Sequence, residues 1–568
     1  MSDMQKPWLK HYPPEIPATL EYPDRIVPDL LKEAYENKPN HIAIRFMGKQ
    51  LTYAELYQAA VDCARALVKL GVKPGDRVSI MLPNCPQYVI SYYGILMAGA
   101  VVVQTNPLYV ERELEYQLND AGAQTIIALD LVFPKIAKVQ ARTPLKNVII
   151  TSIKDYLPFP KNVLYPLVVK KKQGIQVNVE YGNTVHNFKK WLKTGEGVSL
   201  NISQSPDDVA LLQYTGGTTG TPKGVMLTHR NLVVNTYQCK AWMYKAEYGQ
   251  ERSLGIVPLF HVYGMTVVMN ISIAMASTMI LVPKFEVDDA LKTIDKERPT
   301  LFPGAPTMYI ALINHPDVGK YDLSSIKACL SGSAPLPVEV KNKFEALTNG
   351  KLVEGYGLSE TSPVTHANLI WGKNVVGSIG IPWPDTDVTV ISPETGEPAA
   401  TGEIGEIAIK GPQVMKGYWN RPEETEKVFK DGWFLTGDMG YMDEEGYFYI
   451  VDRKKDMIIA GGFNIYPREV EEVLYEHPAV QECAVIGVPD EYRGETVKAF
   501  IVRKEGKQVT EEELEQYCRS KLAAYKVPRI YEFRDELPKS MVGKVLRRVL
   551  VDEERKKAEQ ERDQNVGS

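Results

Sequence analysis

One segment of the chain has residue types that point directly to phosphate chemistry, Tyr214-Thr-Gly-Gly-Thr-Thr-Gly-Thr-Pro-Lys-Gly224. Its glycines allow backbone N–H groups to approach an anion without an intervening Cβ. The threonine hydroxyls add donors and the lysine adds a positive charge, which is typical of a polyphosphate site. An ordinary flexible turn is the alternative, but so much Gly and Thr around one lysine argues against it. The predicted phosphate contacts are Thr215, Gly216, Gly217, Thr218, Thr219, Gly220 and Lys223.

The segment is not a Walker P-loop. The pattern G-x-x-x-x-G-K-[ST] requires a second glycine before the lysine and a Ser or Thr after it. Counting from Gly217, these positions hold Pro222 and Gly224. Proline also removes a donor N–H from the loop. The chain must therefore hold phosphate in another way.

Length and composition bound the class of protein. A chain of 568 residues is too long for one core, so several domains or subdomains are expected. Hydrophobic content of 44% and charged content of 24% are typical of a soluble globular protein. A net charge of −5 provides no basic field, which argues against a nucleic acid partner. The six cysteines are scattered without metal-ligand spacing, which favours reduced thiols over disulfides or a zinc site.

No membrane span or signal peptide is predicted. The first residues have no apolar h-region. Residues 78–110 and 262–282 lack charge, but they contain polar residues or prolines, so buried strands and helices explain them better. A cytoplasmic location is expected. Peripheral contact with the inner face of the membrane and a homodimer are left open.

Strand-like and helix-like segments alternate in the first half of the chain. Residues 12–28 carry five prolines, which predict an extended arm. The pattern then predicts a strand at 42–47 and a helix at 52–70, capped by Thr52 with Glu55 three residues later. Such alternation predicts parallel sheets with helices on their faces. Further strands are predicted at residues 77–82, 125–129 and 147–151.

The second half changes character. From about residue 385 the segments are short and Gly-rich, which suits a small antiparallel barrel or sheet. After the polar break Asp452-Arg-Lys-Lys-Asp456 a compact α+β pattern follows. The β segments are predicted at 388–391, 405–410 and 446–451, and the later helices and strands at 467–476, 480–488, 497–502 and 510–522.

Residues 154–206 contain an apolar strip, 163–169, followed by Lys170-Lys-Lys172. An apolar strip with a basic flank is consistent with contact at a membrane surface, which we keep as a hypothesis. An exposed insertion with a solvated run of charge is the favoured interpretation.

Six segments together resemble the adenylate-forming superfamily of acyl-CoA synthetases, luciferases and peptide-synthetase adenylation domains. The first is the Gly/Thr loop, and the others follow in the family's order over nearly the whole chain. They are Ser331-Gly-Ser-Ala-Pro335, Glu354-Gly-Tyr-Gly-Leu-Ser-Glu-Thr361, Gly432-Trp-Phe-Leu-Thr-Gly-Asp438, Asp452-Arg-Lys-Lys-Asp456 and Pro538-Lys-Ser-Met-Val-Gly-Lys544. The stretches Gly411–Trp419 and 431–455 are most similar to bacterial long-chain fatty acid–CoA ligases.

The resemblance implies a role for residues of the first segments. Glu360 corresponds to the family's Mg²⁺ ligand, with Thr215 and Ser359 near the phosphates. A single carboxylate fits Mg²⁺, which prefers few protein oxygens together with substrate phosphates. Small residues and one aromatic face would form the adenine pocket. Those implied positions are Gly332, Ser333, Ala334, Glu354, Gly355, Tyr356 and Gly357.

It also implies roles for later residues. Asp438 would bind the ribose hydroxyls, with Arg453 near the nucleotide. Lys455 occupies the hinge position, and Lys544 is similar to the lysine that reaches the α-phosphate and the acyl carboxylate. Gly461 and Gly462 would leave room for the pantetheine arm of coenzyme A. His261, in Pro258-Leu-Phe-His-Val-Tyr263, would lie beside the carboxylate at the acyl entrance, with a core histidine as the alternative.

The implied fold class is α/β, with a large N-terminal domain of two parallel-type α/β subdomains plus a small β-barrel, then a small mobile α+β C-terminal domain. The implied limits are residues 1–451, with the β subdomain at about 385–451, a hinge at 452–456 and the mobile domain at 457–568.

The implied activity is ATP-dependent conversion of long-chain fatty acids to acyl-CoA through an acyl-adenylate, with Mg²⁺ as cofactor. Four alternatives stay open: an aryl or 4-coumarate-type ligase, a medium-chain ligase, a luciferase-like monooxygenase and a non-enzymatic lipid-binding protein. A gating tryptophan known in some long-chain members has no counterpart near Gly264 or Met265.

Overall fold

The computed structural model describes residues 6–173, 178–215, 222–460, 463–490, 493–540 and 544–566. The chain forms two compact units. The first comprises Met1–Asp387 and Ile409–Phe434, and the second comprises Val388–Ala408 and Leu435–Ser568. Seven residues of the predicted site lie outside the described residues: Gly216, Gly217, Thr218, Thr219, Gly220, Gly461 and Gly462.

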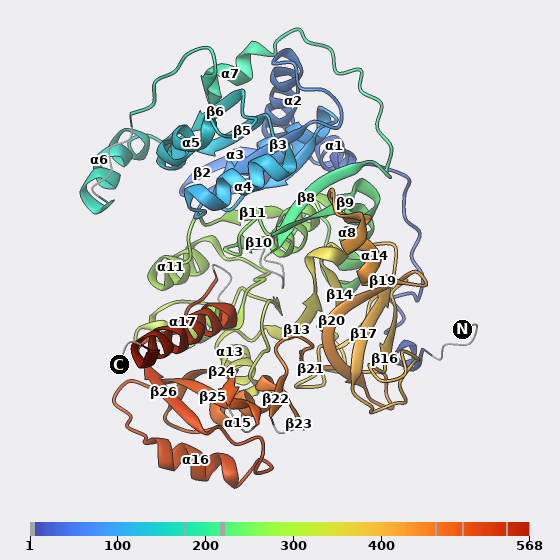
Figure 1. Cartoon of the computed structure of the whole chain (residues 1–568). Helices are drawn as coiled ribbons and strands as arrows, with labels where there is room; N and C mark the ends of the chain where they lie inside the picture. Colours follow the sequence, from blue (N-terminus) through green and yellow to red (C-terminus); the bar gives the residue numbers. More distant parts are fainter. Residues whose placement is uncertain are drawn as a thin grey trace. The chain divides into compact units, whose positions relative to one another are not determined.

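The first unit is built around an eight-stranded sheet (Figure 1). Six of its strands, from β8 to β7, run parallel, and β9 and β18 add an antiparallel edge. The sheet has the order β18 (Gly417–Tyr418), β9 (Lys223–Thr228), β8 (Val209–Thr215), β4 (Val101–Gln104), β3 (Arg77–Met81), β5 (Thr125–Leu129), β6 (Asn147–Thr151) and β7 (Val185–Asn187).

Two four-stranded sheets complete this unit. One has the order β10 (Arg252–Gly255), β11 (Thr278–Leu281), β1 (Ile42–Phe46) and β2 (Lys49–Thr52). The other has the order β12 (Ala328–Ser331), β13 (Lys351–Gly357), β14 (Val364–Ala367) and β15 (Ile381–Pro382). Leu301 bridges Ser253 and Ala328 in parallel register, which links β10 to β12. Two largely parallel sheets with helices around them confirm the predicted α/β class.

Helices pack around these sheets (Figure 1). Those before the Gly/Thr loop are α1 (Val27–Asn37), α2 (Tyr53–Lys69), α3 (Pro86–Met97), α4 (Glu111–Ala121), α5 (Phe133–Gln140), α6 (Lys161–Gln173) and α7 (Phe188–Thr194). Those after it are α8 (His229–Trp242), α9 (Val262–Gly264), α10 (Ile271–Ala274), α11 (Val287–Glu297), α12 (Pro306–Ile313), α13 (Val338–Thr348) and α14 (Pro422–Val428), with a π-helical turn at Met265–Asn270.

Local signals place several elements where the sequence predicts them. Thr52 accepts a hydrogen bond from the Glu55 N–H, and the Glu55 carboxylate accepts one from the Thr52 N–H, so the predicted capping box starts α2. The uncharged residues 78–110 form β3, α3 and β4, and 262–282 run from α9 to β11. Both stretches are largely buried, as expected for core segments. Among the described residues, no helix combines the length and the apolarity needed to cross a membrane.

The second unit contains most of a five-stranded sheet at the place predicted for the small β subdomain. Its order is β16 (Asp387–Ile391), β17 (Gly405–Lys410), β20 (Trp433–Met442) and β19 (Phe429–Lys430), with β21 (Phe448–Arg453) paired to β20. The strand predicted at 446–451 therefore begins and ends two residues later. The predicted hinge at 452–456 and the domain limits around it concern motion, and they stay predictions.

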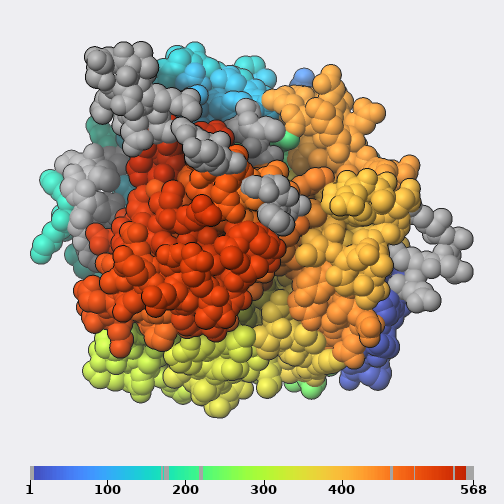
Figure 2. Space-filling view, turned by 60° about the horizontal axis from the view of Figure 1, so that its bottom comes forward, coloured from blue at the N-terminus to red at the C-terminus, as the bar shows by residue number. Residues whose placement is uncertain are grey.

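The remainder of this unit is an α+β body, and its orange and red residues form one closely packed mass in Figure 2. A sheet of β23 (Phe463–Ile465), β22 (Ile458–Ala460), β25 (Gly494–Arg503) and β24 (Val480–Asp490) has β26 (Ile530–Arg534) paired to β25. The helices are α15 (Pro467–Tyr475), α16 (Glu511–Arg519) and α17 (Arg547–Val566). The helix predicted to reach residue 522 ends at Arg519.

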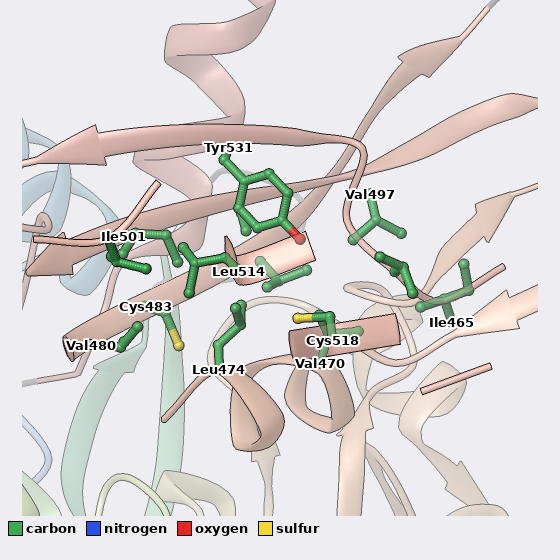
Figure 3. Packing of buried hydrophobic residues seen from close by; sticks show 14 of the residues in the cluster. Ile465, Val470, Leu474, Val480, Cys483, Val497, Ile501, Leu514, Cys518 and Tyr531 are labelled. Atoms are coloured by element: carbon green, nitrogen blue, oxygen red, sulfur yellow. The ribbon is translucent and has the colours of Figure 1, made fainter. Parts of the chain in front are cut away.

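A hydrophobic core holds α15 and α16 to the sheet (Figure 3). Val470 and Leu474 of α15 and Leu514 of α16 point toward Val497 and Ile501 of β25. All five side chains are fully buried or nearly so. Burying a Val or Leu side chain contributes about 1.5–3 kcal/mol, so this core stabilises the α+β body without the help of a disulfide. All six cysteines of the chain are free and buried.

A buried histidine gives the first unit a specific dependence on pH. His229 begins α8, and its Nδ1 accepts a hydrogen bond of 3.2 Å from the Val27 N–H at the start of α1. Burial lowers the pKa of His229 to about 4. The unfolded chain therefore takes up a proton on His229 between pH 6.5 and 4, whereas the folded chain does not. The contribution of neutral His229 to the free energy of unfolding is lost as pH falls through this window.

We expect His229→Asn to flatten this acid dependence, because Asn Oδ1 can still accept from Val27 and cannot be protonated. A shift from an ordinary pKa near 6.5 to about 4 corresponds to about 3 kcal/mol of unfolding free energy. Urea denaturation from pH 7.5 to 4 measures the effect. Parallel curves for the two proteins would refute the assignment.

Candidate active site

The Gly/Thr loop joins two neighbouring antiparallel strands. Thr215 of β8 pairs with Lys223 of β9, and Tyr214 pairs with Gly224, so the loop begins and ends at adjacent positions. A Cβ at Gly224 would lie 3.2 Å from the Tyr214 ring, which leaves the ring packed against the returning strand. Two predicted phosphate contacts, Thr215 and Lys223, are therefore held side by side by the sheet.

Asp120, at the end of α4, anchors the base of this loop. Its Oδ2 accepts a hydrogen bond of 2.7 Å from the Tyr214 hydroxyl, and its Oδ1 pairs with Arg421 Nη2 at 2.7 Å. Its carbonyl accepts from Trp419 Nε1 at 3.2 Å. The carboxylate is only 10% exposed, so it is costly to bury without these partners. Asp120 therefore ties the end of β8 to residues 419–421.

Tyr116 supports the returning side of the loop. It lies one turn before Asp120 on α4, and its hydroxyl donates to the Pro222 carbonyl at 2.9 Å. The peptide before Lys223 is thus fixed by a side chain of helix α4.

Tyr418 lies between the lysine of the loop and the predicted metal ligand. Its hydroxyl donates to Glu360 Oε1 at 2.9 Å, and Lys223 Nζ lies 5.1 Å from the centroid of its ring. Burial and the Glu360 carboxylate raise the pKa of Tyr418, which keeps the hydroxyl protonated as a donor. Lys223 also forms an ion pair with Glu424 and is 14% exposed. Tyr418 thus links Lys223, which is paired to Thr215 across the two strands, with Glu360.

Of the two segments predicted to form the adenine pocket, one follows β12 and the other is the last part of the adjacent parallel strand β13. Ser331 of β12 pairs with Glu354 of β13, so residues 332–334 and 355–357 lie at the same sheet edge. Glu354 Oε2 accepts from the Leu336 N–H at 3.1 Å, which fixes the loop after β12. Ser333 adopts a left-handed conformation, φ +72°, which is uncommon for a residue with a side chain.

The structure gives another reason for the glycines of the second segment. A Cβ at Gly357 would lie 2.1 Å from the Pro363 carbonyl oxygen, and one at Gly355 would lie 2.7 Å from Leu330 Cδ1. Close packing within the sheet therefore requires glycine at 357 and favours it at 355, whether or not a base lies against them. The Tyr356 ring makes an edge contact with His366, with 5.7 Å between centroids.

His261 is half-buried at the start of α9. Its Nδ1 accepts a hydrogen bond of 3.3 Å from the Tyr263 N–H. Tyr263 in turn donates to the Gly304 carbonyl at 3.2 Å, and a Cβ at Gly332 would lie 3.2 Å from its ring. The segment that carries His261 is thus connected to the loop after β12.

In the second unit, Asp438 and Arg453 are cross-strand neighbours on β20 and β21. Arg453 Nε lies 3.4 Å from Asp438 Oδ1. The preceding turn is held by Glu406, whose carboxylate accepts from the Gly437 N–H at 3.0 Å and pairs with Lys454 at 2.9 Å. The Thr-Gly-Asp turn is therefore supported by three separate polar contacts.

Lys544 shares this electrostatic environment. Burial, together with the positive charge of Arg453, lowers its pKa to about 7, and Asp438 opposes the shift. Its backbone is held by Ser540, whose N–H donates to the Lys544 carbonyl at 2.8 Å and whose Oγ accepts from the Lys544 N–H at 3.2 Å. Lys455 is an exposed residue, but the part of its side chain that is shielded from water lowers its pKa.

An ionic network surrounds the start of the predicted hinge. The buried Asp452 accepts from the Arg468 N–H at 2.7 Å and lies 3.4 Å from Arg547. Arg547 also pairs with Glu471 at 2.6 Å and with Asp456 at 3.5 Å. Although burial opposes its charge, these carboxylates raise the pKa of Arg547. The network joins the end of β21 to α15 and α17.

Sequence reasoning missed the residues that support the Gly/Thr loop: Tyr116, Asp120, Tyr418, Arg421 and Glu424. They lie up to about 200 residues from the loop in sequence, and no local pattern marks them. Tyr418 lies within the stretch Gly411–Trp419, which carries the family resemblance, and Arg421 and Glu424 follow that stretch directly. This was the one available signal.

The fold and the anchored Gly/Thr hairpin define a class of nucleotide-dependent enzymes. The sequence profile of the AMP-binding enzyme family matches residues 31–419, and that of the AMP-binding enzyme C-terminal domain matches residues 469–544. The chain belongs to the family of AMP-binding enzymes, which confirms the predicted resemblance.

Individual relatives narrow the likeness further. The chain is 61% identical to a long-chain-fatty-acid–CoA ligase of Bacillus subtilis, over 97% of this chain and 98% of that protein. It is 42% identical to a ligase of the same name from Yersinia pestis, over 97% and 98%. Among solved structures, an anthranilate CoA ligase in complex with anthranoyl-AMP has a TM-score of 0.81 at 27% identity, over 94% of this chain and 98% of that one.

We expect Asp120→Asn to weaken ATP binding. The substitution removes the charge that pairs with Arg421 and leaves one acceptor oxygen for two donors. Loss of a charged, largely buried hydrogen-bond acceptor costs about 1–3 kcal/mol, which corresponds to roughly a five- to hundredfold rise in Kd for ATP. Isothermal titration measures this change.

Glu115→Gln is the matched control. Glu115 lies on the same helix and pairs with Arg142 at the surface. Surface pairs contribute little, so this variant should bind ATP as the unchanged protein does. Equal ATP affinity in both variants would contradict an anchoring role for Asp120.

Proposed function

We propose that the chain is a long-chain fatty acid–CoA ligase that works through an acyl-adenylate. The observation that carries this proposal is the 61% identity to such a ligase over 97% of the chain. The anchored Gly/Thr hairpin, with Glu360 next to it through Tyr418, supports the nucleotide-dependent step.

The reaction has two halves. In the first, a carboxylate oxygen of the fatty acid attacks the α-phosphorus of ATP, and the bond to the bridging oxygen of pyrophosphate breaks. In the second, the sulfur of coenzyme A attacks the acyl carbon, the bond to AMP breaks and the thiol proton passes to solvent. Neither half requires a covalent intermediate with the protein. The enzyme has to orient the two reactants and neutralise their charge.

The first unit would bind the triphosphate. Residues 215–220 with Lys223 would hold the β- and γ-phosphates, and Ser359 lies one residue before Glu360 in the same turn. The ends of β12 and β13 would receive the adenine, with Tyr356 as the stacking face. His261 would lie beside the fatty acid carboxylate.

The second unit would complete the nucleotide site. Asp438 would accept hydrogen bonds from the ribose hydroxyls, with Arg453 beside it. Lys544 would neutralise the α-phosphate and the acyl carboxylate as they approach each other. Rotation about Lys455 would then withdraw Lys544 and bring Gly461 and Gly462 to the pantetheine arm.

The residues present fit a Mg²⁺ ion. Glu360 is a half-buried carboxylate beside the loop, and Mg²⁺ prefers one or two protein carboxylates together with phosphate oxygens. Across the described part of the chain, no group of three or more His, Cys, Asp or Glu side chains could hold a metal by itself. Glu360 and Thr215 would hold the ion, which would offset the phosphate charge when bound.

We also infer a cytoplasmic location, where ATP and coenzyme A are available, and no nucleic acid partner, since the net charge is −5. A homodimer stays a prediction.

AMP release with different acids tests the reaction and the substrate class. We expect palmitate to give the highest kcat/KM, with octanoate and 4-coumarate lower by about tenfold or more, because each buried methylene contributes about 0.8 kcal/mol. The assay is run with and without coenzyme A, and thioester is measured in parallel. AMP release without thioester would exclude the ligase, and oxygen consumption or light would favour a monooxygenase.

Lys544→Ala tests the assignment of the two halves. We expect the variant to lose acyl-adenylate formation by about a hundredfold or more, as for other residues that stabilise transition-state charge. It should still convert supplied palmitoyl-AMP to palmitoyl-CoA. Lys539→Ala, five residues earlier and paired with Glu482, is the matched control and should retain both halves. Equal loss of both halves in Lys544→Ala would refute the proposed rotation.

A further inference from the structure

Helix α6 exposes apolar side chains that no described residue of the first unit covers. The exposed fractions of Val163, Leu164 and Leu167 are 61%, 50% and 65%. Phe159, just before the helix, is 81% exposed. Figure 1 shows α6, in teal, at the edge of the first unit and away from the eight-stranded sheet. The segment is therefore a surface helix whose outward side is apolar.

The same side of α6 carries positive charge. With 100° between successive residues, Val163, Leu164, Leu167, Lys170 and Lys171 fall within an arc of about 120°. Lys170 and Lys171 are exposed, whereas Asn162 and Tyr165 on the opposite side are partly buried. We call the five outward residues the α6 outer face. An apolar strip that ends in lysines on one helical face is the pattern of helices that lie in a lipid headgroup region.

A neighbouring turn lies beside the start of α6. Lys161 Nζ donates to the Met47 carbonyl at 3.0 Å, so the turn between β1 and β2 contacts the side of the helix next to the α6 outer face. Three large apolar side chains exposed on one helical face mark an interaction site rather than scattered surface residues.

We propose that the α6 outer face docks the enzyme on an anionic phospholipid bilayer. The chain carries a net charge of −5, so an anionic surface repels most of it, and only a local basic site can attract it. A second copy of the chain fits this face less well, because a symmetric contact would gather the lysines of both copies, Lys170 and Lys171 twice over, at one interface. The apolar residues would enter the headgroup region and the lysines would pair with lipid phosphates.

The proposal goes beyond the ligase reaction and does not depend on it. It concerns how the protein reaches a surface in which long-chain fatty acids are dissolved. Binding to vesicles can be measured without ATP or coenzyme A, so a failure of docking and a failure of the ligase assignment are distinguished.

Co-sedimentation of the full chain with vesicles is the test. We expect binding to phosphatidylglycerol–phosphatidylcholine vesicles, and at least tenfold weaker binding to phosphatidylcholine alone. Val163→Gln/Leu164→Gln/Leu167→Gln and, separately, Lys170→Glu/Lys171→Glu should each lower binding at least tenfold. Gln is a good helix former, so α6 should persist, and circular dichroism checks this.

Two matched controls lie on the same unit. Val338→Gln/Leu347→Gln removes exposed apolar residues from α13, and Lys190→Glu/Lys193→Glu reverses exposed charges on α7. Both should bind vesicles as the unchanged protein does. With octanoate in solution, every variant should keep its AMP release, whereas palmitate supplied in anionic vesicles should be used at least several-fold more slowly by the two α6 variants only.

Three results would overturn the proposal. The first is unchanged vesicle binding in both α6 variants. The second is an equal loss of binding in the α7 or α13 controls, which would indicate a general charge or apolar effect. The third is a lipid-free dimer that becomes a monomer in the α6 variants, which would assign the face to a second copy of the chain.

Discussion

The antiparallel pairing of β8 with β9 brings the two ends of the Gly/Thr segment together. Glycine loses more backbone entropy on ordering than any other residue, so firm support at the ends of such a segment matters. Asp120 gives this support, because one carboxylate holds both Tyr214 and Arg421. The hairpin edge, the preceding helix α4 and the segment after β18 therefore form one support. The candidate phosphate site depends on that support as much as on its own residues.

Charge is arranged differently in the second unit. There the cations stand close to carboxylates in pairs and networks, as with Arg453 and Asp438, or Arg547 and Glu471. Lys544 differs from these residues, because burial and the charge of Arg453 lower its pKa to about 7 although Asp438 opposes the shift. An anionic ligand beside it would raise that pKa again, since an opposite charge favours the protonated form. Such a lysine is suited to respond to the arrival of a phosphate rather than to hold a permanent ion pair.

The sequence predicted those features that local patterns determine. Alternating hydrophobic segments predicted the parallel sheets, the Thr52–Glu55 capping box predicted the start of α2, and uncharged stretches were assigned correctly to the core. Asp120 and Tyr418 could not be found in this way, because their importance comes from contacts across some 60 to 300 residues of chain. The helix α6 was also not predicted, since Pro166 interrupts its pattern and its apolar side faces outward. Amphipathic reasoning assumes that the apolar side faces a core.

Gly355 and Gly357 show how a motif can be located correctly and explained incompletely. The sequence resemblance associates these glycines with a nucleotide base, yet the Pro363 carbonyl already excludes a side chain at Gly357, and one at Gly355 would displace Leu330. The same segment carries Glu354, which fixes the neighbouring loop, and Glu360, which is held by Tyr418. Packing thus determines the path of the backbone, and this path places the functional groups that follow it. A glycine in such a motif therefore indicates a tightly constrained strand end. It indicates a ligand only indirectly, because that constraint positions the residues that bind the ligand.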